Sequence, residues 1–123
     1  MKIKAALLTT GAIGLASIAA AQDLIEVPVE GKDRWYYTSS QVFGENQVQM
    51  HYFHVEGAAG FDVVSDFNCK ARTIKVVFES RSAPETFPLP HDEGTEEKIK
   101  PGSAEEYLAK AACSRNDLTL EDN

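Results

Sequence analysis

The residues of this sequence that could bind a metal ion or haem iron gather on one predicted strand. Met50, His51 and His54 lie close together, and His91 is distant. Thioether and imidazole ligands suit copper, and imidazole also suits haem iron and zinc. On a strand, His51 and His54 point to opposite faces because their separation is odd, and Met50 and His54 lie roughly 13 Å apart along one face. We therefore expect packing and surface roles for these residues rather than a metal site, and no cofactor.

The remaining polar residues show no arrangement typical of catalysis. Nucleophilic catalysis requires a serine or thiol beside a histidine and an orienting acid, and no serine here stands in a turn typical of such a site. The carboxylate pairs at 96–97 and 105–106 lie in stretches predicted to be exposed. There they solvate a surface or complement a helix start more readily than they transfer protons. The sequence thus predicts a protein that is not an enzyme.

Cys69 and Cys113 are the two cysteines of the chain. In an oxidising compartment a lone pair has one intramolecular connectivity. Their bond would close a loop of about 44 residues and remove ~4 kcal/mol of chain entropy from the unfolded state. A redox pair is usually closer in sequence, and a metal site needs more ligands than two thiols. The pattern favours a structural disulfide.

The N-terminus indicates that the chain is exported. A positive start at 1–4, an apolar run at 5–20 and the small residues 19–21 are the three parts of a cleavable signal peptide, which we assign to 1–21. The apolar run of about 16 residues is short of the ~20 that span a bilayer. The bacterial lipoprotein route requires a cysteine at the cleavage site, and none lies there. We expect a periplasmic or secreted product without a membrane span.

The charge of the chain restricts its partners. It has 12 Lys and Arg against 19 Asp and Glu, a net charge of −7. Cleavage would remove two lysines and leave 102 residues with a net charge of about −9, enough chain for one domain. Nucleic acid and anionic lipid need cationic partners, so both are disfavoured. An acidic surface suits solubility and also a cationic partner.

Most of the mature chain shows the alternation typical of strands. The segment 22–33 contains Pro28 and is either an N-terminal arm or an edge strand. In 47–55, Val48, Met50 and Tyr52 alternate with a polar row that includes Gln49 and His51. The proline-rich segment 84–94 predicts a long exposed connection. The expected strands are 34–43, 47–55, 61–69, 73–79 and a short one within 97–100.

A C-terminal helix follows Pro101 and Gly102. Ser103 and Glu106 form the S-x-x-E pattern of a capping box. An apolar stripe then leads to Cys113, and the residues beyond it are polar. We expect an α+β fold: a single small domain at 34–115 with a curved antiparallel β-sheet, a C-terminal helix tied to it by the disulfide, and a flexible tail at 116–123.

Aromatic residues supply the candidate binding surface. Aromatic side chains pack in cores more often than they line grooves, but they can do either. The candidates are Trp35, Tyr36, Tyr37, Tyr52 and Phe53.

Three short segments carry a family resemblance. They are Trp35-Tyr36-Tyr37 before Ser39 and Ser40, Phe67-Asn68-Cys69-Lys70, and Ile99-Lys100-Pro101-Gly102-Ser103 before a helix that ends on Cys113. This ordered set covers most of 34–113 and resembles the surface-adhesin protein E family of bacterial exported proteins.

The resemblance implies a curved antiparallel sheet whose C-terminal helix is held across one face by the bond between Cys69 and Cys113. It also implies an adhesin that binds host extracellular-matrix proteins, and haem binding. Two features depart from the family. Asn68 stands where an acidic residue is usual, and the lipoprotein cysteine of the outer-membrane adhesins is missing.

The sequence therefore predicts an exported binding or interaction module of the cell envelope. The alternative is a periplasmic inhibitor of a cell-wall hydrolase such as lysozyme, since a small acidic β domain suits a basic enzyme. A haem carrier is a third interpretation. An open sheet edge would also allow a homodimer.

Overall fold

The computed structural model describes residues 25–122, so the predicted signal peptide at 1–21 lies outside the described residues. Within them six strands form one sheet in the order β1-β2-β3-β4-β5-β6, each neighbouring pair antiparallel, and one helix follows. This confirms the predicted antiparallel sheet with a C-terminal helix. The elements are β1 (Ile25–Val27), β2 (Arg34–Gly44), β3 (Gln47–Glu56), β4 (Ala59–Asn68), β5 (Thr73–Ser80), β6 (Glu97–Lys98) and α2 (Ala104–Ser114).

Tight turns make β2 to β5 a meander. Asn46, in the β2–β3 turn, has a φ of 62°, and Gly57, in the β3–β4 turn, has a φ of 61°. Asn and Gly adopt this left-handed conformation at the least cost. The segment 22–33 contributes the edge strand β1, whose Val27 pairs with Trp35 of β2. Of residues 25–122, none forms a helix long and apolar enough to cross a membrane.

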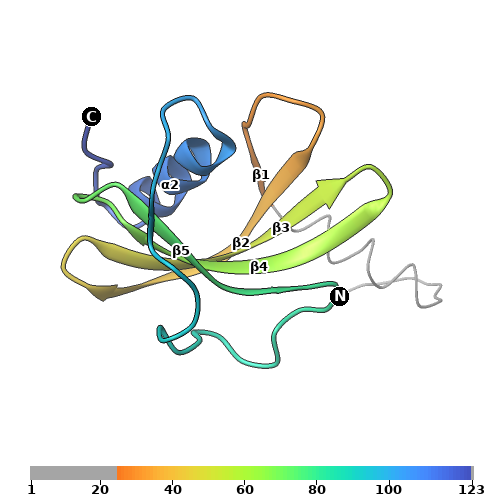
Figure 1. Ribbon diagram of the computed structural model, residues 1–123, viewed down its shortest axis with the longest axis horizontal. Helices are drawn as coiled ribbons and strands as arrows, with labels where there is room; N and C mark the ends of the chain where they lie inside the picture. The colour runs from red at the N-terminus through yellow and green to blue at the C-terminus, as the bar shows by residue number, and fades with distance from the viewer. Residues whose placement is uncertain (1–24, 123) are drawn as a thin grey trace, which may run out of the picture.

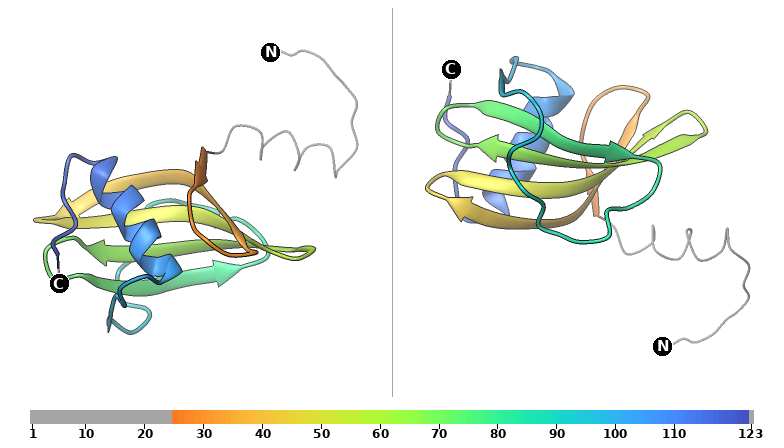
Figure 2. Two further views of the ribbon diagram at one scale, coloured as in Figure 1. Left: turned by 90° about the horizontal axis from the view of Figure 1, so that it is seen from above. Right: turned by 60° about the horizontal axis from the view of Figure 1, so that its bottom comes forward.

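The curved sheet has a different cover on each face (Figure 1). The helix α2 lies against the concave face, and the segment 81–96 crosses the opposite face (Figure 2). The core lies between the sheet and α2, because the apolar sides of the alternating strands point there. Its buried residues are Val27, Val48, Met50, Tyr52, Val63, Phe67, Cys69, Ile74, Ile99, Leu108, Ala109, Ala112 and Cys113.

The face opposite α2 is not the exposed polar face that the alternation of β3 suggested. Gln49 is 0% exposed and His51 is 8% exposed. They are covered by the segment 81–96, which includes the stretch 84–94 that we expected to be an exposed connection. Gln49 bonds both backbone groups of Leu89, and Phe87 lies beside the His51 ring. The connection is long because it must cross the sheet.

The helix begins as its sequence predicts, with one difference. The Ser103 hydroxyl accepts a hydrogen bond from the amide of Glu106 at 3.3 Å. In return the Glu106 carboxylate accepts from the amide of Gly102 at 3.0 Å, where a standard capping box would use the amide of Ser103. Both bonds satisfy amides at the start of the helix and fix where α2 begins.

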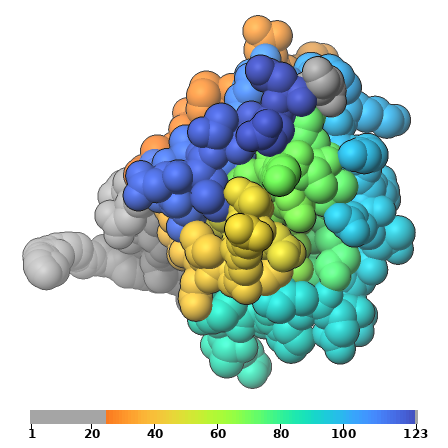
Figure 3. Space-filling view, turned by 90° about the vertical axis from the view of Figure 1, so that its left-hand side faces the viewer, coloured from red at the N-terminus to blue at the C-terminus, as the bar shows by residue number. Residues whose placement is uncertain are grey.

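The C-terminal segment differs from the flexible tail that we expected at 116–123. The Glu121 amide donates to the carbonyl of Cys69 at 2.9 Å, and Leu118 and Leu120 pack against the core. Figure 3 shows this blue segment lying against the β2–β3 turn in yellow and the β4–β5 turn in green. Two spaced leucines are enough to hold residues 116–122 on the protein, because they meet apolar surface that the helix leaves uncovered.

Candidate binding site

The five aromatic candidates do not form one surface. Trp35, Tyr37 and Tyr52 lie on the face of the sheet that packs against α2, and Tyr52 is 3% exposed. Tyr36 and Phe53 are paired with each other across β2 and β3 and point to the opposite face. Within each strand the parity separates neighbouring aromatic residues, so the run Trp35-Tyr36-Tyr37 is divided between the two faces.

On the helix side these rings are engaged in packing. The Trp35 ring stacks on His54 with centroids 3.6 Å apart, and the Arg115 guanidinium lies 4.1 Å from the centroid of the Tyr37 ring. The Tyr52 hydroxyl bonds the hydroxyl of Ser65 at 2.9 Å. Packing is therefore the main use of these three aromatic residues.

Each of the three histidines contacts an aspartate at 2.8 Å: His51 with Asp62, His54 with Asp33 and His91 with Asp66. The first two histidines lie on opposite faces, as their spacing predicts. Met50 is fully buried in the core. No group of three or more His, Cys, Asp or Glu side chains among residues 25–122 is placed to hold a metal ion.

A buried polar cluster joins the sheet to the segment 81–96. The Gln49 amide donates to Asp66 at 2.8 Å and to the carbonyl of Leu89 at 3.0 Å. His91 stacks on Phe43 with ring centroids 3.9 Å apart, and its backbone carbonyl accepts from the Lys75 ammonium group. The cluster draws on four strands, so the sequence contained no local signal for it. Its contacts hold the segment against the sheet.

The disulfide joins the end of β4 to the last turn of α2. Cys69 and Cys113 are bonded, their Cα atoms lie 6.1 Å apart, and both residues are 0% exposed. This confirms the predicted pairing. Because the bond is buried, it holds the helix across the concave face from within the core.

Arg72 is a second junction, which the sequence analysis did not identify. Its guanidinium donates to the Glu106 carboxylate and to the backbone carbonyl of Glu121, both at 2.7 Å. The residue is 6% exposed and has a φ of 57°. These contacts connect the β4–β5 turn, α2 and the C-terminal segment. The pKa of Glu106 is lowered, mainly because its carboxylate accepts a hydrogen bond from the amide of Gly102 and next because it accepts one from Arg72.

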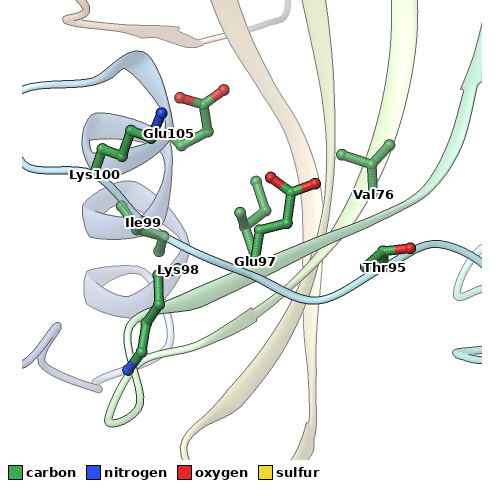
Figure 4. A pocket seen from close by; sticks show the side chains of 8 residues that line it. Val76, Thr95, Glu97, Lys98, Ile99, Lys100 and Glu105 are labelled. Atoms are coloured by element: carbon green, nitrogen blue, oxygen red, sulfur yellow. The ribbon is translucent and has the colours of Figure 1, made fainter.

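A hollow of about 490 Å³ lies between β5, the segment 95–100 and the first turn of α2 (Figure 4). We call it the β5–α2 hollow. Its floor is apolar and its rim is charged. It is lined by Ile74, Val76, Thr95, Glu97, Lys98, Ile99, Lys100 and Glu105.

The floor of this hollow is exposed apolar surface at the edge of the sheet. Val76 is 41% exposed, one of three large hydrophobic side chains that stand out on the described surface. Within residues 25–122, β6 pairs only with Thr73 and Ile74, so from Val76 onward β5 is paired with β4 on one side and has no strand on its outer edge. Gly94 passes the Val76 carbonyl with a φ of 87°, and a Cβ at that position would collide with the carbonyl oxygen.

The rim of the β5–α2 hollow has two carboxylates and two ammonium groups. The carboxylates stand at the opening, whereas one of the two lysines points away from it. In Figure 4 the Glu97 and Glu105 carboxylates stand beside the opening, Lys100 extends toward Glu105, and Lys98 points away. The Lys98 ammonium group donates to the carbonyl of Ala71 at 2.9 Å. Neither carboxylate forms an ion pair with any described residue within 4.0 Å. The rim therefore has no net charge, and Glu97 is the carboxylate toward which neither lysine of the rim extends.

Glu105 also acts on the buried hydroxyl of Tyr52 in the core. Burial raises the pKa of its hydroxyl far above the ordinary value, and the negative charges of Glu105 and Glu79 raise it further. Glu79 lies farther along β5 and is paired with Val63, whose side chain is in the core on the α2 side. Three carboxylates thus face this side of the molecule.

A second hollow of about 390 Å³ lies between β1 and the C-terminal half of α2. We call it the β1–α2 hollow. Of the five aromatic candidates it contains Tyr37, and its charged residues are Lys110 and Arg115 against Glu26. Neither hollow has a histidine, methionine or cysteine among the described residues that line it, while the β1–α2 hollow has Tyr37 and Tyr107.

Comparison with known proteins finds no relative: no family model, no curated protein and no solved structure matches this chain. The resemblance to surface-adhesin protein E therefore rests on the three segments of the sequence described above.

Proposed function

We propose that this chain is an exported binding module of the cell envelope, similar in role to surface-adhesin protein E, and that its partner is a protein. The observation that carries the proposal is the β5–α2 hollow. It combines an exposed apolar floor with free carboxylates, and it lies beside a length of sheet edge that no described strand covers. Apolar surface rimmed by polar groups is typical of interaction sites.

Two features make the hollow a rigid platform. The bond between Cys69 and Cys113 and the ion pair between Arg72 and Glu106 both hold α2 against the sheet. The hollow lies between these elements, so its walls keep their spacing when it is empty. A preformed site loses less conformational entropy on binding. The three contacts between histidine and aspartate connect strands with each other and with the segments between them.

Export is tested by expressing the full chain in a bacterium and determining the mass of the product. Cleavage after residue 21 should release a product that begins at Gln22 and is found outside the cytoplasm. A product that stays in the cytoplasm with residues 1–21 attached would contradict export.

Binding is tested by surface plasmon resonance with purified extracellular-matrix proteins over the immobilised mature chain. We expect saturable binding to at least one of them. Variant Cys69→Ala/Cys113→Ala should bind more weakly, because the hollow loses its fixed walls. Binding that does not saturate, or equal binding by the variant, would count against a rigid adhesin-like platform.

The carboxylates of the β5–α2 hollow also support a second candidate function, a periplasmic inhibitor of a basic cell-wall hydrolase such as lysozyme. A chain with a net charge of −7 and free carboxylates at an apolar hollow is complementary to a cationic enzyme. The measurement is the rate at which a hen-type lysozyme lyses cells in the presence of the mature chain. An unchanged rate at a large molar excess eliminates this candidate.

A further inference from the structure

We infer that the β5–α2 hollow takes a single cationic side chain, an arginine or a lysine on the surface of the partner protein, with its aliphatic stem on Ile74 and Val76 and its charged end between Glu97 and Glu105. This inference rests on the proposed function and specifies the chemistry of its partner.

The shape of the site matches such a side chain. Arginine and lysine combine an apolar stem with a charged end, and they are most stable where both parts are accommodated. The hollow offers an apolar floor on β5, and in Figure 4 the Glu97 carboxylate rises beside that floor while Glu105 stands across the opening on α2. A purely apolar ligand would leave both carboxylates partly desolvated without a partner, which costs free energy.

Glu97 is the group of the rim that favours a cation. The Lys98 ammonium group donates to the Ala71 carbonyl and Lys100 extends toward Glu105, while Glu97 forms no ion pair with a described residue. Glu79 adds a third carboxylate on this side of the sheet. The net charge of the chain attracts a basic partner from a distance, since complementary charge steers association.

The β1–α2 hollow is the contrasting site on the same helix. Its rim cations already lie over aromatic rings, Lys110 at 5.9 Å from the Tyr107 centroid and Arg115 at 4.1 Å from that of Tyr37. With two cations against the one carboxylate of Glu26, this hollow disfavours a further cationic side chain. The two ends of α2 therefore discriminate between ligands by charge, and a cationic probe should reach only the hollow beside β5.

The experiment is an NMR titration of the ¹⁵N-labelled mature chain with a pentapeptide that is blocked at both ends and whose one charged residue is a central arginine. A second peptide has lysine at that position, and a control peptide has citrulline, which keeps the shape of arginine without its charge. We expect amide shifts at Val76, at residues 95–100 and at Glu105. The citrulline peptide should bind about tenfold more weakly or worse.

Matched variants separate a specific site from general attraction. Glu97→Gln/Glu105→Gln should weaken binding of the arginine peptide at least about tenfold. Glu85→Gln/Glu93→Gln removes the same charge from exposed positions on the segment 81–96 and should change it less than about twofold. Val76→Thr, which keeps the branched shape, should weaken binding by making the floor polar.

Three results would overturn the inference. The first is no shift at the hollow with either cationic peptide up to roughly 10 mM. The second is equal weakening by the two glutamine variants, which would mean diffuse attraction. The third is equal binding of the citrulline peptide.

If Glu97→Gln/Glu105→Gln binds a matrix protein normally, the proposed function stands and this inference fails. If the peptide binds but no protein partner does, the inference stands and the proposed function fails.

Discussion

At the scale of single residues, the ion pair between Arg72 and Glu106 connects the β4–β5 turn with α2 and the C-terminal segment. Arg72 is nearly buried and also bonds the carbonyl of Glu121, while Glu106 caps the start of α2. A buried arginine without its partner is strongly destabilising, since its charge has been removed from water. The stability of the domain should therefore depend on the charge of Glu106.

The first prediction concerns Glu106→Gln and pH. The pKa of Glu106 in the folded protein is below its ordinary value of 4.5, so its charge stabilises the fold above that pH. The variant should be less stable than the wild type at pH 7. The difference should shrink as the pH falls below about 4.5 and vanish below the folded pKa.

Urea unfolding of both proteins from pH 7 to pH 2.5 would measure this difference. Glu85→Gln serves as the control, because Glu85 is exposed and has no described ion pair. A difference between Glu106→Gln and the wild type that stays constant across the whole range would contradict the role assigned to the charge.

At the scale of elements, the segment 81–96 acts as a cover for the second face of the sheet. It has no strand or helix, so it depends on side chains of the sheet for its position. Gln49 accepts from the Leu89 amide at 2.6 Å and donates to the Leu89 carbonyl and to Asp66. One buried amide thus connects the cover to β3 and β4.

The second prediction is that Gln49→Ala detaches this cover locally. Buried groups of Leu89 and Asp66 would lose their partner, which should lower the free energy of unfolding by about 2–3 kcal/mol. Amide exchange of Leu89 should become faster at the same time. Gln41→Ala, at an exposed position of β2, should change neither quantity. Unchanged exchange at Leu89 in Gln49→Ala would show that other contacts hold the segment.

At the scale of the whole molecule, one disulfide links the middle of the chain to the C-terminal helix. It connects β4 with α2 across 44 positions of the chain, and the C-terminal segment returns to the carbonyl of Cys69 at the same place. The helix, the sheet and the C-terminus therefore meet around one buried bond. A domain of about 100 residues buries a modest share of its surface, so such a bond is a large part of its stability.

The third prediction is that Cys69→Ala/Cys113→Ala loses about 4 kcal/mol of unfolding free energy, the chain entropy released by opening a loop of this length. Urea unfolding of both proteins under non-reducing conditions would give the value. The effect should come mainly from the unfolded state, so the variant should keep the same pattern of strands and helix. A loss below about 1 kcal/mol would show that core packing alone holds α2 in place.

The main elements of the fold and the disulfide could be predicted from the sequence, because each depends on a local pattern. Alternating residues of β3 indicated a strand with Val48, Met50 and Tyr52 on its core side. Ser103 and Glu106 marked the start of α2, and two cysteines allow one intramolecular pairing. These signals lie within a few residues of each other or admit one solution.

The candidate site could not be predicted, and the reason is geometric. Periodicity assigns a residue to a face of its strand but does not say what covers that face, so Gln49 could not be identified as buried. Alternation along β2 places Tyr36 on the face of the sheet opposite that of Trp35 and Tyr37. Val76 is far in the chain from Glu97 and Glu105, and the three meet only because β5, the segment 95–100 and α2 converge. The sequence by itself determined the elements and their cross-link, and the tertiary structure decided which side chains share a surface, since that depends on contacts between distant segments.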